Sequence, residues 1–273
     1  MSTTKISACY ALGGRLRDKL KLALFGLLAP PRERANKRWW RLGSRFIPKL
    51  WLRPKKLNGL RLLIQPSDWS QTVIFEEVFL QSSYDLDKLS FTPELILDCG
   101  AHIGTFSLLA KSRFPGSMLK AYEPNPQNAE FVRKQIAKNG LDIQFFECAI
   151  SIETKELHFA ISNSHHGTLQ HDPASPGTCK VHAIDFIETF QKFKPRSLLL
   201  KMDVEGEERL ILPMLVPLLP QQTALFFETH AGEAGWREMA ALLQAAGFLV
   251  EQVNARGQFY DGFAQRNPAP TKL

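Results

Sequence analysis

The stretch that decides the fold is LILDCGAHIGTFSLLAK, residues 95–111. An apolar run ends at Asp98, glycines follow at Gly100 and Gly104, and the apolar spacing then becomes helical. This pattern predicts a buried strand, a tight turn and a helix that begins at the turn. In a sheet of parallel strands, ligands bind at such a turn, outside the carboxyl ends of the strands.

Apolar runs typical of strands alternate with helical segments on both sides of this stretch. Strands are expected at residues 61–65, 94–98, 118–123, 143–150, 155–161, 179–183, 197–203, 223–230, 248–254 and 258–264. Helices are expected at residues 71–81, 105–114, 126–140, 207–219 and 235–247. Strands joined through helices pair in parallel, whereas the last two are divided by a short turn and must be antiparallel. We therefore expect an α/β fold, with a doubly wound, mainly parallel seven-stranded sheet that ends in an antiparallel hairpin.

The charge of the chain is divided unevenly. Residues 1–56 hold 15 Lys and Arg against Asp18 and Glu33, a net charge of +13, whereas the remainder carries −6. We expect a basic N-terminal segment, residues 1–60, attached to a main domain, residues 61–273. Within the segment, residues 12–29 form either a basic amphipathic helix that lies on anionic membrane, or a helical cap that packs on the domain with a solvated basic face.

The four cysteines, Cys9, Cys99, Cys148 and Cys179, are widely spaced and include no CxxC pair. This spacing argues against a zinc site or a disulfide framework and favours a reducing compartment. We expect the protein to be cytoplasmic, with membrane association at the cytoplasmic face as a further possibility through residues 12–56. The oligomeric state cannot be read from the sequence.

The glycine turn does not have the spacing of a dinucleotide site. Such a site would show GxGxxG, but here the glycines are spaced GxxxG and an acid precedes them, which would repel a phosphate. A second acid, Glu123, ends the next strand and can accept hydrogen bonds from both hydroxyls of a ribose. A ligand with a ribose, an ammonium group and no phosphate is S-adenosylmethionine. The alternative role for Glu123 is to complement the dipole of the helix that begins near Pro126.

Candidate catalytic residues gather in LLKMDVEGEE, residues 199–208. Lys201 and Asp203 are two residues apart, so they point to the same side of the strand. Methyl transfer needs the two reactants held in line, and a hydroxyl acceptor must also lose its proton. We predict Asp203 as the base or acceptor-orienting group, with Glu205 next and Lys201 as its partner.

The next strand supplies Glu228, which we expect to touch the acceptor, and His230, a further candidate base. An imidazole has an ordinary pKa near ~6.5, which suits proton removal, although His230 is equally well interpreted as a loop residue that caps backbone. Together with Asp203 and Glu205 these side chains offer a possible divalent-metal site, which we do not predict. The polar segment at residues 162–171 is either a lid, in which His165, His166 or Thr168 would touch the acceptor, or equally well an ordinary surface loop.

Four motifs resemble the FkbM family of S-adenosylmethionine-dependent methyltransferases over residues 70–255. They are DCGAHIGTFS (98–107), YEPNPQN (122–128), LLKMDVEGEE (199–208) and FFETH (226–230). The resemblance implies a class I, Rossmann-like methyltransferase fold and, in most members, O-methylation of a sugar, a glycolipid or a secondary metabolite. The family usually carries Asn where this chain has His102.

The resemblance also implies which residues hold the cofactor. The residues expected to bind it lie at the glycine turn and around the second acid. They are Asp98, Gly100, Ala101, His102, Gly104, Glu123 and Asn125. Methyltransferases commonly place adenine contacts at the end of the third strand, which makes Glu147, Cys148 and Ala149 candidates; strand packing explains them equally well.

Three other functions are alternatives to O-methylation. A non-catalytic or membrane-docking module that keeps the fold is the main alternative. An N-methyltransferase is disfavoured because DVEG stands where an Asp/Asn-Pro-Pro-aromatic motif would lie, so nucleic-acid bases are not expected as acceptors. A nicotinamide-dependent oxidoreductase is disfavoured by the glycine spacing.

Overall fold

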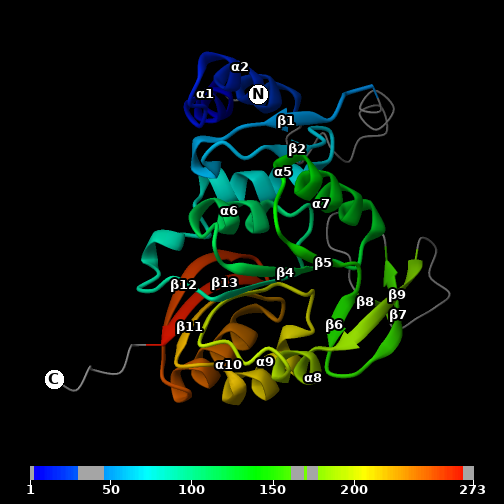
Figure 1. Ribbon diagram of the computed structural model, residues 1–273, viewed down its shortest axis with the longest axis vertical. Helices are drawn as coiled ribbons and strands as arrows, with labels where there is room; N and C mark the ends of the chain where they lie inside the picture. Colours follow the sequence, from blue (N-terminus) through cyan, green and yellow to red (C-terminus); the bar gives the residue numbers. More distant parts are fainter. Residues whose placement is uncertain (1–2, 30–45, 161–168, 171–177, 267–273) are drawn as a thin grey trace.

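The computed structural model describes residues 3–29, 46–160, 169–170 and 178–266 of the chain. A seven-stranded sheet crosses its centre in the order β12-β13-β11-β10-β3-β4-β5 (Figure 1). Its strands are β3 (Leu95–Cys99), β4 (Met118–Tyr122), β5 (Gln144–Phe146), β10 (Ser197–Met202), β11 (Gln222–Thr229), β12 (Phe248–Arg256) and β13 (Phe259–Arg266). The first five in chain order pair in parallel, and the hairpin β12–β13 joins β11 antiparallel. This is the class I methyltransferase order predicted from the sequence.

Helices cover both faces of the sheet (Figure 1). One face carries α5 (Trp69–Phe75), α6 (Thr105–Arg113) and α7 (Pro126–Asn139), and the other carries α8 (Phe186–Gln191), α9 (Glu208–Leu215), η4 (Val216–Leu218) and α10 (Gly232–Ala245). Successive side chains of a strand point to opposite faces of the sheet, so each strand contributes to two separate hydrophobic cores. Ile96 and Leu199 enter the first core, while their neighbours Leu97 and Leu200 enter the second. Burial on both faces explains why β3 and β10 are continuous apolar runs.

The segment after β5 departs from the prediction. Residues 143–150 were expected to form one strand, but β5 ends at Phe146 and a new strand, β6 (Ala149–Ser151), begins in a second sheet. That sheet has the order β6-β9-β7-β8 and also contains β7 (Lys155–Ala160), β8 (Leu169–Gln170) and β9 (Thr178–Asp185). An apolar run reports that its residues are buried, but not which sheet buries them, so the single-strand prediction was wrong.

The N-terminal segment packs on the domain as a helical layer. Its described elements are α1 (Thr3–Ala11), α2 (Leu16–Leu28), β1 (Leu50–Leu52) and η1 (Lys55–Leu57), and β2 (Leu62–Ile64) follows directly after residue 60. Phe25 of α2 is buried, and its ring centroid lies 4.5 Å from that of Phe75 in α5. Strands β1 and β2 pair antiparallel across residue 60, the predicted domain boundary. Among the described residues, no helix is both long and apolar enough to cross a bilayer.

The helix expected at residues 71–81 has two parts. Asp68 caps α5 by accepting hydrogen bonds from the backbone N–H of Ser70 and Gln71. At Glu76 the helix widens into a π-helical turn, η2 (Glu76–Leu80), and a further short turn, η3 (Leu86–Lys88), precedes β3. A π-helical turn inserts an extra residue into a helix, and such turns are frequent at functional sites. Here Glu77, in the widened turn, lines the pocket described below.

Candidate active site

The turn after β3 requires glycine at Gly100. Its φ is +80°, in the left-handed region, and a Cβ built on it would lie 1.8 Å from the backbone oxygen of Asp203. No side chain fits at that distance, so the loops after β3 and β10 can touch only through a glycine. This contact brings the predicted cofactor turn and the predicted base to the same point.

Hydrogen bonds to the end of β4 hold the turn in shape. The backbone N–H groups of Gly100 and Ala101 both donate to the carbonyl oxygen of Tyr122, at 3.0 and 2.9 Å. His102, with φ +50°, donates its N–H to Glu123 Oε2 at 2.7 Å, and its ring Nε2 lies 3.0 Å from Ser70 Oγ of α5. His102 therefore orders the backbone of the turn in this structure.

Glu123 is buried beside the turn. Its Oε1 accepts a hydrogen bond from the backbone N–H of Asn125 at 2.9 Å, while Asn125 Oδ1 caps α7 at the N–H of Gln127. Burial raises the pKa of Glu123 to about 7, although the donors from Asn125 and His102 oppose the rise. Asn128 Nδ2 also donates to Oε1, at 3.4 Å, so of the about four acceptor positions of the carboxylate about one is left for a further donor, which would favour the charged form.

Asp98 lies beneath the turn and is completely buried. Its Oδ2 accepts a hydrogen bond from Ser107 Oγ at 2.5 Å, and its Oδ1 lies 3.8 Å from Lys201 Nζ. Burial raises the pKa of Asp98, and the positive charge of Lys201 offsets part of that rise. Lys201 also donates to the carbonyl oxygen of Gly100 at 2.7 Å, so this buried pair supports the turn from below.

This donor set fits S-adenosylmethionine. The turn offers a glycine-bounded backbone, Glu123 offers a buried carboxylate beside it, and Gly104 opens α6 with φ +82°. At the first position of α6, the buried hydroxyl oxygen of Thr105 has no hydrogen-bond partner within the described part of the chain. A polar ligand at the turn would satisfy such a group.

The remaining predicted cofactor and acceptor residues lie further along the chain. Cys148 is buried in the second core, and Ala149 begins β6 in the second sheet. Both were expected within the third strand, but they follow the end of β5, and their contact with adenine stays a prediction. His166 and Thr168 lie outside the described residues.

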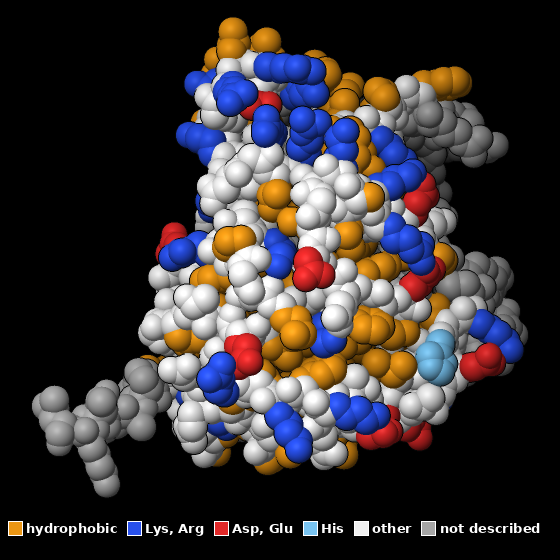
Figure 2. Space-filling view, in the orientation of Figure 1, with side chains coloured by type: hydrophobic (Ala, Val, Ile, Leu, Met, Phe, Trp, Pro, Cys, Tyr) orange, Lys and Arg blue, Asp and Glu red, His pale blue; other side chains and the backbone are white. Residues whose placement is uncertain are grey.

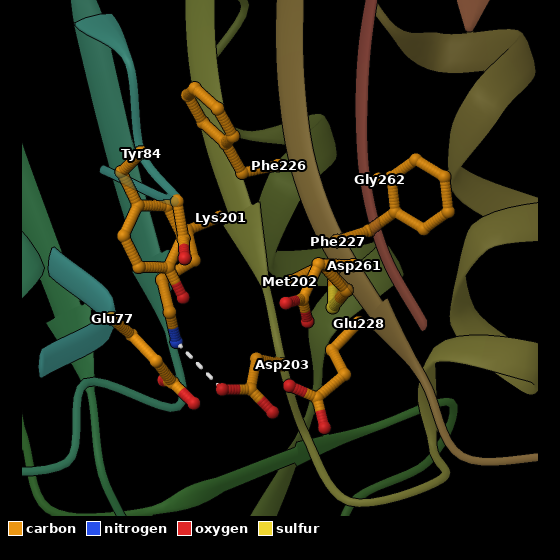
Figure 3. Close-up of a pocket in the computed structure, with 11 residues that line it drawn as sticks. Glu77, Tyr84, Lys201, Met202, Asp203, Phe226, Phe227, Glu228, Asp261 and Gly262 are labelled. Atoms are coloured by element: carbon orange, nitrogen blue, oxygen red, sulfur yellow. Dashed lines mark hydrogen bonds and ion pairs between the residues drawn. The ribbon is translucent and has the colours of Figure 1, made fainter. Parts of the chain in front are cut away.

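A pocket opens beside the turn, at the ends of β10, β11 and β13 (Figure 3). It is lined by Glu77, Ser83, Tyr84, Lys201, Met202, Asp203, Phe226, Phe227, Glu228, Asp261 and Gly262. Lys201 Nζ lies 3.3 Å from Asp203 Oδ2, which confirms that these two side chains share one side of the strand. Figure 3 shows the carboxyl groups of Glu77, Asp203 and Glu228 turned toward a common space.

The crowding of acids changes the protonation of Glu228. Burial raises its pKa to about 10, and the negative charges of Asp203 and Asp261 act in the same direction. Glu228 therefore holds its proton near neutral pH and can donate a hydrogen bond. Burial and the charge of Asp203 likewise hold the pKa of the Tyr84 hydroxyl well above its ordinary value. Lys201 stays charged, because Asp203 and Asp98 raise its pKa more than burial lowers it.

His230 is enclosed by carboxylates. Its Nδ1 lies 2.7 Å from Glu208 Oε1, and its Nε2 lies 3.4 Å from Glu205 Oε2 and 3.5 Å from Glu228 Oε1. Burial lowers the pKa of His230, but the hydrogen bonds to Glu205 and Glu208 outweigh it and raise the pKa to about 11. A charged imidazole cannot accept a proton, so this geometry favours Asp203 as the base and a positioning role for His230.

Asp203, Glu228 and His230 are also the candidate metal ligands. Each offers one ligand atom, and these atoms lie within 4.8 Å of one another. A divalent cation bound there would displace the protons that Glu228 and His230 hold near neutral pH. Proton competition therefore weakens this cluster as a metal site.

The sequence did not single out four residues around the pocket. They are Glu77, Tyr84, Arg256 and Asp261. Arg256 forms an ion pair with Glu77, and its Nη2 lies 3.0 Å from Asp261 Oδ2 and 3.4 Å from Glu228 Oε2. Glu77 and Asp261 are 184 positions apart in the chain. Glu77 lies in a pattern that indicates a helix and Asp261 in one that indicates a hairpin, so neither pattern marks a site. The one available signal was the position of Asp261 on the strand next to β11.

A match to a family model decides the family of the chain. The model of the methyltransferase FkbM domain matches residues 98–250, more than half of the chain. The chain belongs to the FkbM methyltransferase family. The matched span begins at the acid before the glycine turn and includes β10, β11 and most of the candidate site, and the cofactor of such domains is S-adenosylmethionine.

Curated relatives match in part. Methyltransferase sdnD of Sordaria araneosa is 32% identical over 80 residues, which cover 29% of this chain and 30% of that protein. Methyltransferase 1 of Beauveria bassiana is 26% identical over 163 residues, covering 51% of this chain and 65% of that protein. The chain thus spans less than two thirds of these relatives.

Solved structures also align with the chain. The FkbM methyltransferase of Methylobacillus flagellatus aligns with 95% of this chain and 58% of its own, at 13% identity and a TM-score of 0.48.

Proposed function

We propose that this chain is an S-adenosylmethionine-dependent methyltransferase that methylates a hydroxyl group of a sugar, a glycolipid or a secondary metabolite. The observation that carries the proposal is the contact of Gly100 with the Asp203 loop, which joins a cofactor turn to an acid-lined pocket. When bound, the cofactor supplies a methyl group on a sulfonium, which needs no further activation.

On the cofactor side, the chain contributes a prebuilt cradle. The turn at residues 100–104 approaches the ligand with its backbone, and Glu123 accepts hydrogen bonds from the ribose hydroxyls. Asp98 acts through Ser107 and Lys201, which hold the turn. Cys148 and Ala149 border the adenine. Apart from Ser107 and Lys201, these are the cofactor residues predicted from the sequence, and the buried, hydrogen-bonded surroundings of Asp98 and Glu123 support the assignment.

On the acceptor side, Asp203 takes the proton of the acceptor hydroxyl. Lys201 steadies the carboxylate that receives it, and Glu228, which keeps its own proton, donates a hydrogen bond to an acceptor oxygen. Glu205 and His230 shape the loop that carries Asp203. The supporting argument is chemical: a neutral alcohol is a poor nucleophile until a base removes its proton.

The remaining parts of the proposal concern the domain organisation and the setting. Residues 61–273 would form the catalytic domain behind a cap that contains α1 and α2. The described cysteines Cys9, Cys99 and Cys148 are free and buried, which supports a reducing, cytoplasmic setting.

The test measures binding and turnover separately. Calorimetry with S-adenosylhomocysteine should show binding to the wild-type protein and to Asp203→Asn with affinities that agree within a few-fold. S-adenosylhomocysteine release would then be followed with panels of hydroxylated, amine and carboxylate acceptors. With the acceptor that works, Asp203→Asn should lower kcat by about 10²–10⁴-fold. Asp142→Asn, on an exposed loop, is the matched control and should leave kcat unchanged.

Two outcomes would contradict the proposal. Turnover confined to amine acceptors would assign N-methylation instead, and Asp203→Asn with wild-type kcat would remove Asp203 as the base. If the wild type bound S-adenosylhomocysteine but turned over none of the panel, the alternative of a non-catalytic module with the same fold would gain support.

A further inference from the structure

Four leucines form an exposed stripe along α2. Leu16, Leu20, Leu24 and Leu27 have 66%, 58%, 43% and 52% of their surfaces exposed. Their spacing of four, four and three residues aligns them on one face of the helix. Single exposed leucines are ordinary on protein surfaces, but a contiguous row marks a surface that binds something.

The opposite face of α2 fixes the orientation of this stripe. Leu22 and Phe25 are completely buried, and Phe25 packs against Phe75 of α5. Gly26 lets α1 approach, since a Cβ there would lie 3.2 Å from Cys9 Sγ. The helix therefore cannot roll its leucines inward without losing these contacts.

Basic side chains flank the stripe. Arg15 and Arg17 are exposed at the start of α2, and Lys19 and Lys21 are partly exposed on either side of the leucines. Lys19 Nζ lies 5.2 Å from the ring of Tyr10, a second exposed apolar group in this layer. Figure 2 shows hydrophobic and basic side chains together at this end of the molecule, above the main domain.

We propose that this face of α2, the leucine stripe with its flanking Arg and Lys, docks on an anionic lipid bilayer. Leucines that enter the acyl boundary, with long basic side chains that reach back to the headgroups, are the arrangement of a helix lying in the interface plane. The helix has 13 residues, below the ~20 needed to span a bilayer, so it lies on the membrane.

Charge complementarity selects this occupant over two others. A second copy would bring another segment of net charge +13 against the first, which repels it. A nucleic acid would match the charge but would leave the four leucines in contact with phosphates. Only an anionic bilayer meets both the apolar stripe and its basic flanks. The docking face shares no residue with the pocket, so this proposal stands apart from the proposed function.

The test is cosedimentation of the full-length protein with vesicles of phosphatidylcholine alone or mixed with phosphatidylglycerol. We expect binding to the mixed vesicles that weakens with salt. The double variant Leu16→Glu/Leu20→Glu should lower the partition coefficient about tenfold or more, and Arg15→Gln/Arg17→Gln should lower it severalfold. The matched control is Leu249→Glu, because Leu249 is 64% exposed on β12, away from this layer, and should bind like the wild type.

Each other outcome overturns the proposal. Failure of the wild type to bind mixed vesicles, or equal binding by the wild type and both double variants, would remove the bilayer as the occupant of this face. A dimer in sedimentation equilibrium that Leu16→Glu/Leu20→Glu dissociates, without vesicle binding, would assign the face to a second copy. Arg15→Gln/Arg17→Gln keeps the leucines and so tests the proposal even where the glutamate variant misfolds.

Discussion

The cofactor turn and the acceptor pocket both depend on carboxylates but use them in opposite ways. At the turn, Asp98 and Glu123 are each met by donors from the protein, namely Ser107 and Lys201 for one and the N–H groups of His102 and Asn125 for the other. In the pocket, Asp203, Glu228 and Asp261 crowd together, and although Lys201 and Arg256 lie beside them, burial and the neighbouring negative charges keep a proton on Glu228.

The difference separates a prebuilt scaffold from a reactive site. Donors that are already in place hold the turn in one shape before any ligand arrives, so binding there costs little reorganisation. Crowded acids instead shift one another's pKa values, which is how a single pocket can contain both a proton acceptor and a proton donor near neutral pH. Three substitutions test this contrast, taken from the largest expected effect to the smallest.

The first is Gly100→Ala at the turn. The new Cβ would meet the backbone oxygen of Asp203 at 1.8 Å and would also sit on a residue with φ +80°. We expect the free energy of unfolding to fall by about 3 kcal/mol and S-adenosylhomocysteine binding to be lost, because the two loops must move apart. Urea denaturation and calorimetry measure the two effects.

Gly140→Ala is the control for backbone strain alone. Gly140 has φ +61° at the end of α7, but nothing lies within 4 Å of a Cβ there. This variant should lose about 1 kcal/mol and keep its affinity for S-adenosylhomocysteine. Equal losses in both variants would mean that the contact with Asp203 contributes nothing.

The second substitution is Glu123→Gln. Gln keeps one acceptor oxygen and adds an N–H₂ group, so one backbone N–H now faces a donor and the ribose loses a charged acceptor. We expect affinity for S-adenosylhomocysteine to fall about 10–100-fold, the usual worth of a hydrogen bond to a charged group. Because the pKa of Glu123 is about 7, wild-type affinity should rise from pH 6 to pH 8, and this rise should be absent in the variant. If the affinity rose with pH equally in the wild type and in Glu123→Gln, Glu123 would not bind the ligand.

The third substitution is Glu228→Gln in the pocket. Glu228 is already protonated near neutral pH, so the isosteric amide should leave kcat within about threefold of the wild type at pH 7. The folded protein holds this proton up to about pH 10, whereas the unfolded chain releases it near ~4.3. The folded state therefore binds more protons across that window, and its stability falls as pH rises.

Thermal unfolding between pH 6 and pH 9 measures this slope. The melting temperature should fall less steeply in Glu228→Gln than in the wild type, and a remaining slope is expected from His230, whose raised pKa acts in the same direction. Glu251→Gln, at an exposed ion pair with Lys88, should keep the wild-type slope. An unchanged slope in Glu228→Gln would mean that its carboxyl does not hold the proton.

Sequence reasoning predicted the sheet more completely than the pocket. Parallel order, the glycine turn and the acids at strand ends follow from local patterns, because a buried strand must be apolar and a left-handed turn needs glycine. The split of residues 143–150 between two sheets was missed for the opposite reason, since the choice of sheet depends on β9, which lies about 30 residues away.

Local chemistry in the sequence thus determined the fold family, the cofactor turn and the positions of Asp98, Glu123 and Asp203 along their strands. Only the tertiary structure brought Glu77 and Arg256 to the acceptor side and gave Glu228 and His230 their protons. Secondary-structure propensity and hydrophobic periodicity depend on residues that are close together in the sequence, so they can be read from it. Desolvation and Coulomb interactions depend on which side chains meet in space, and the folded chain alone decides that.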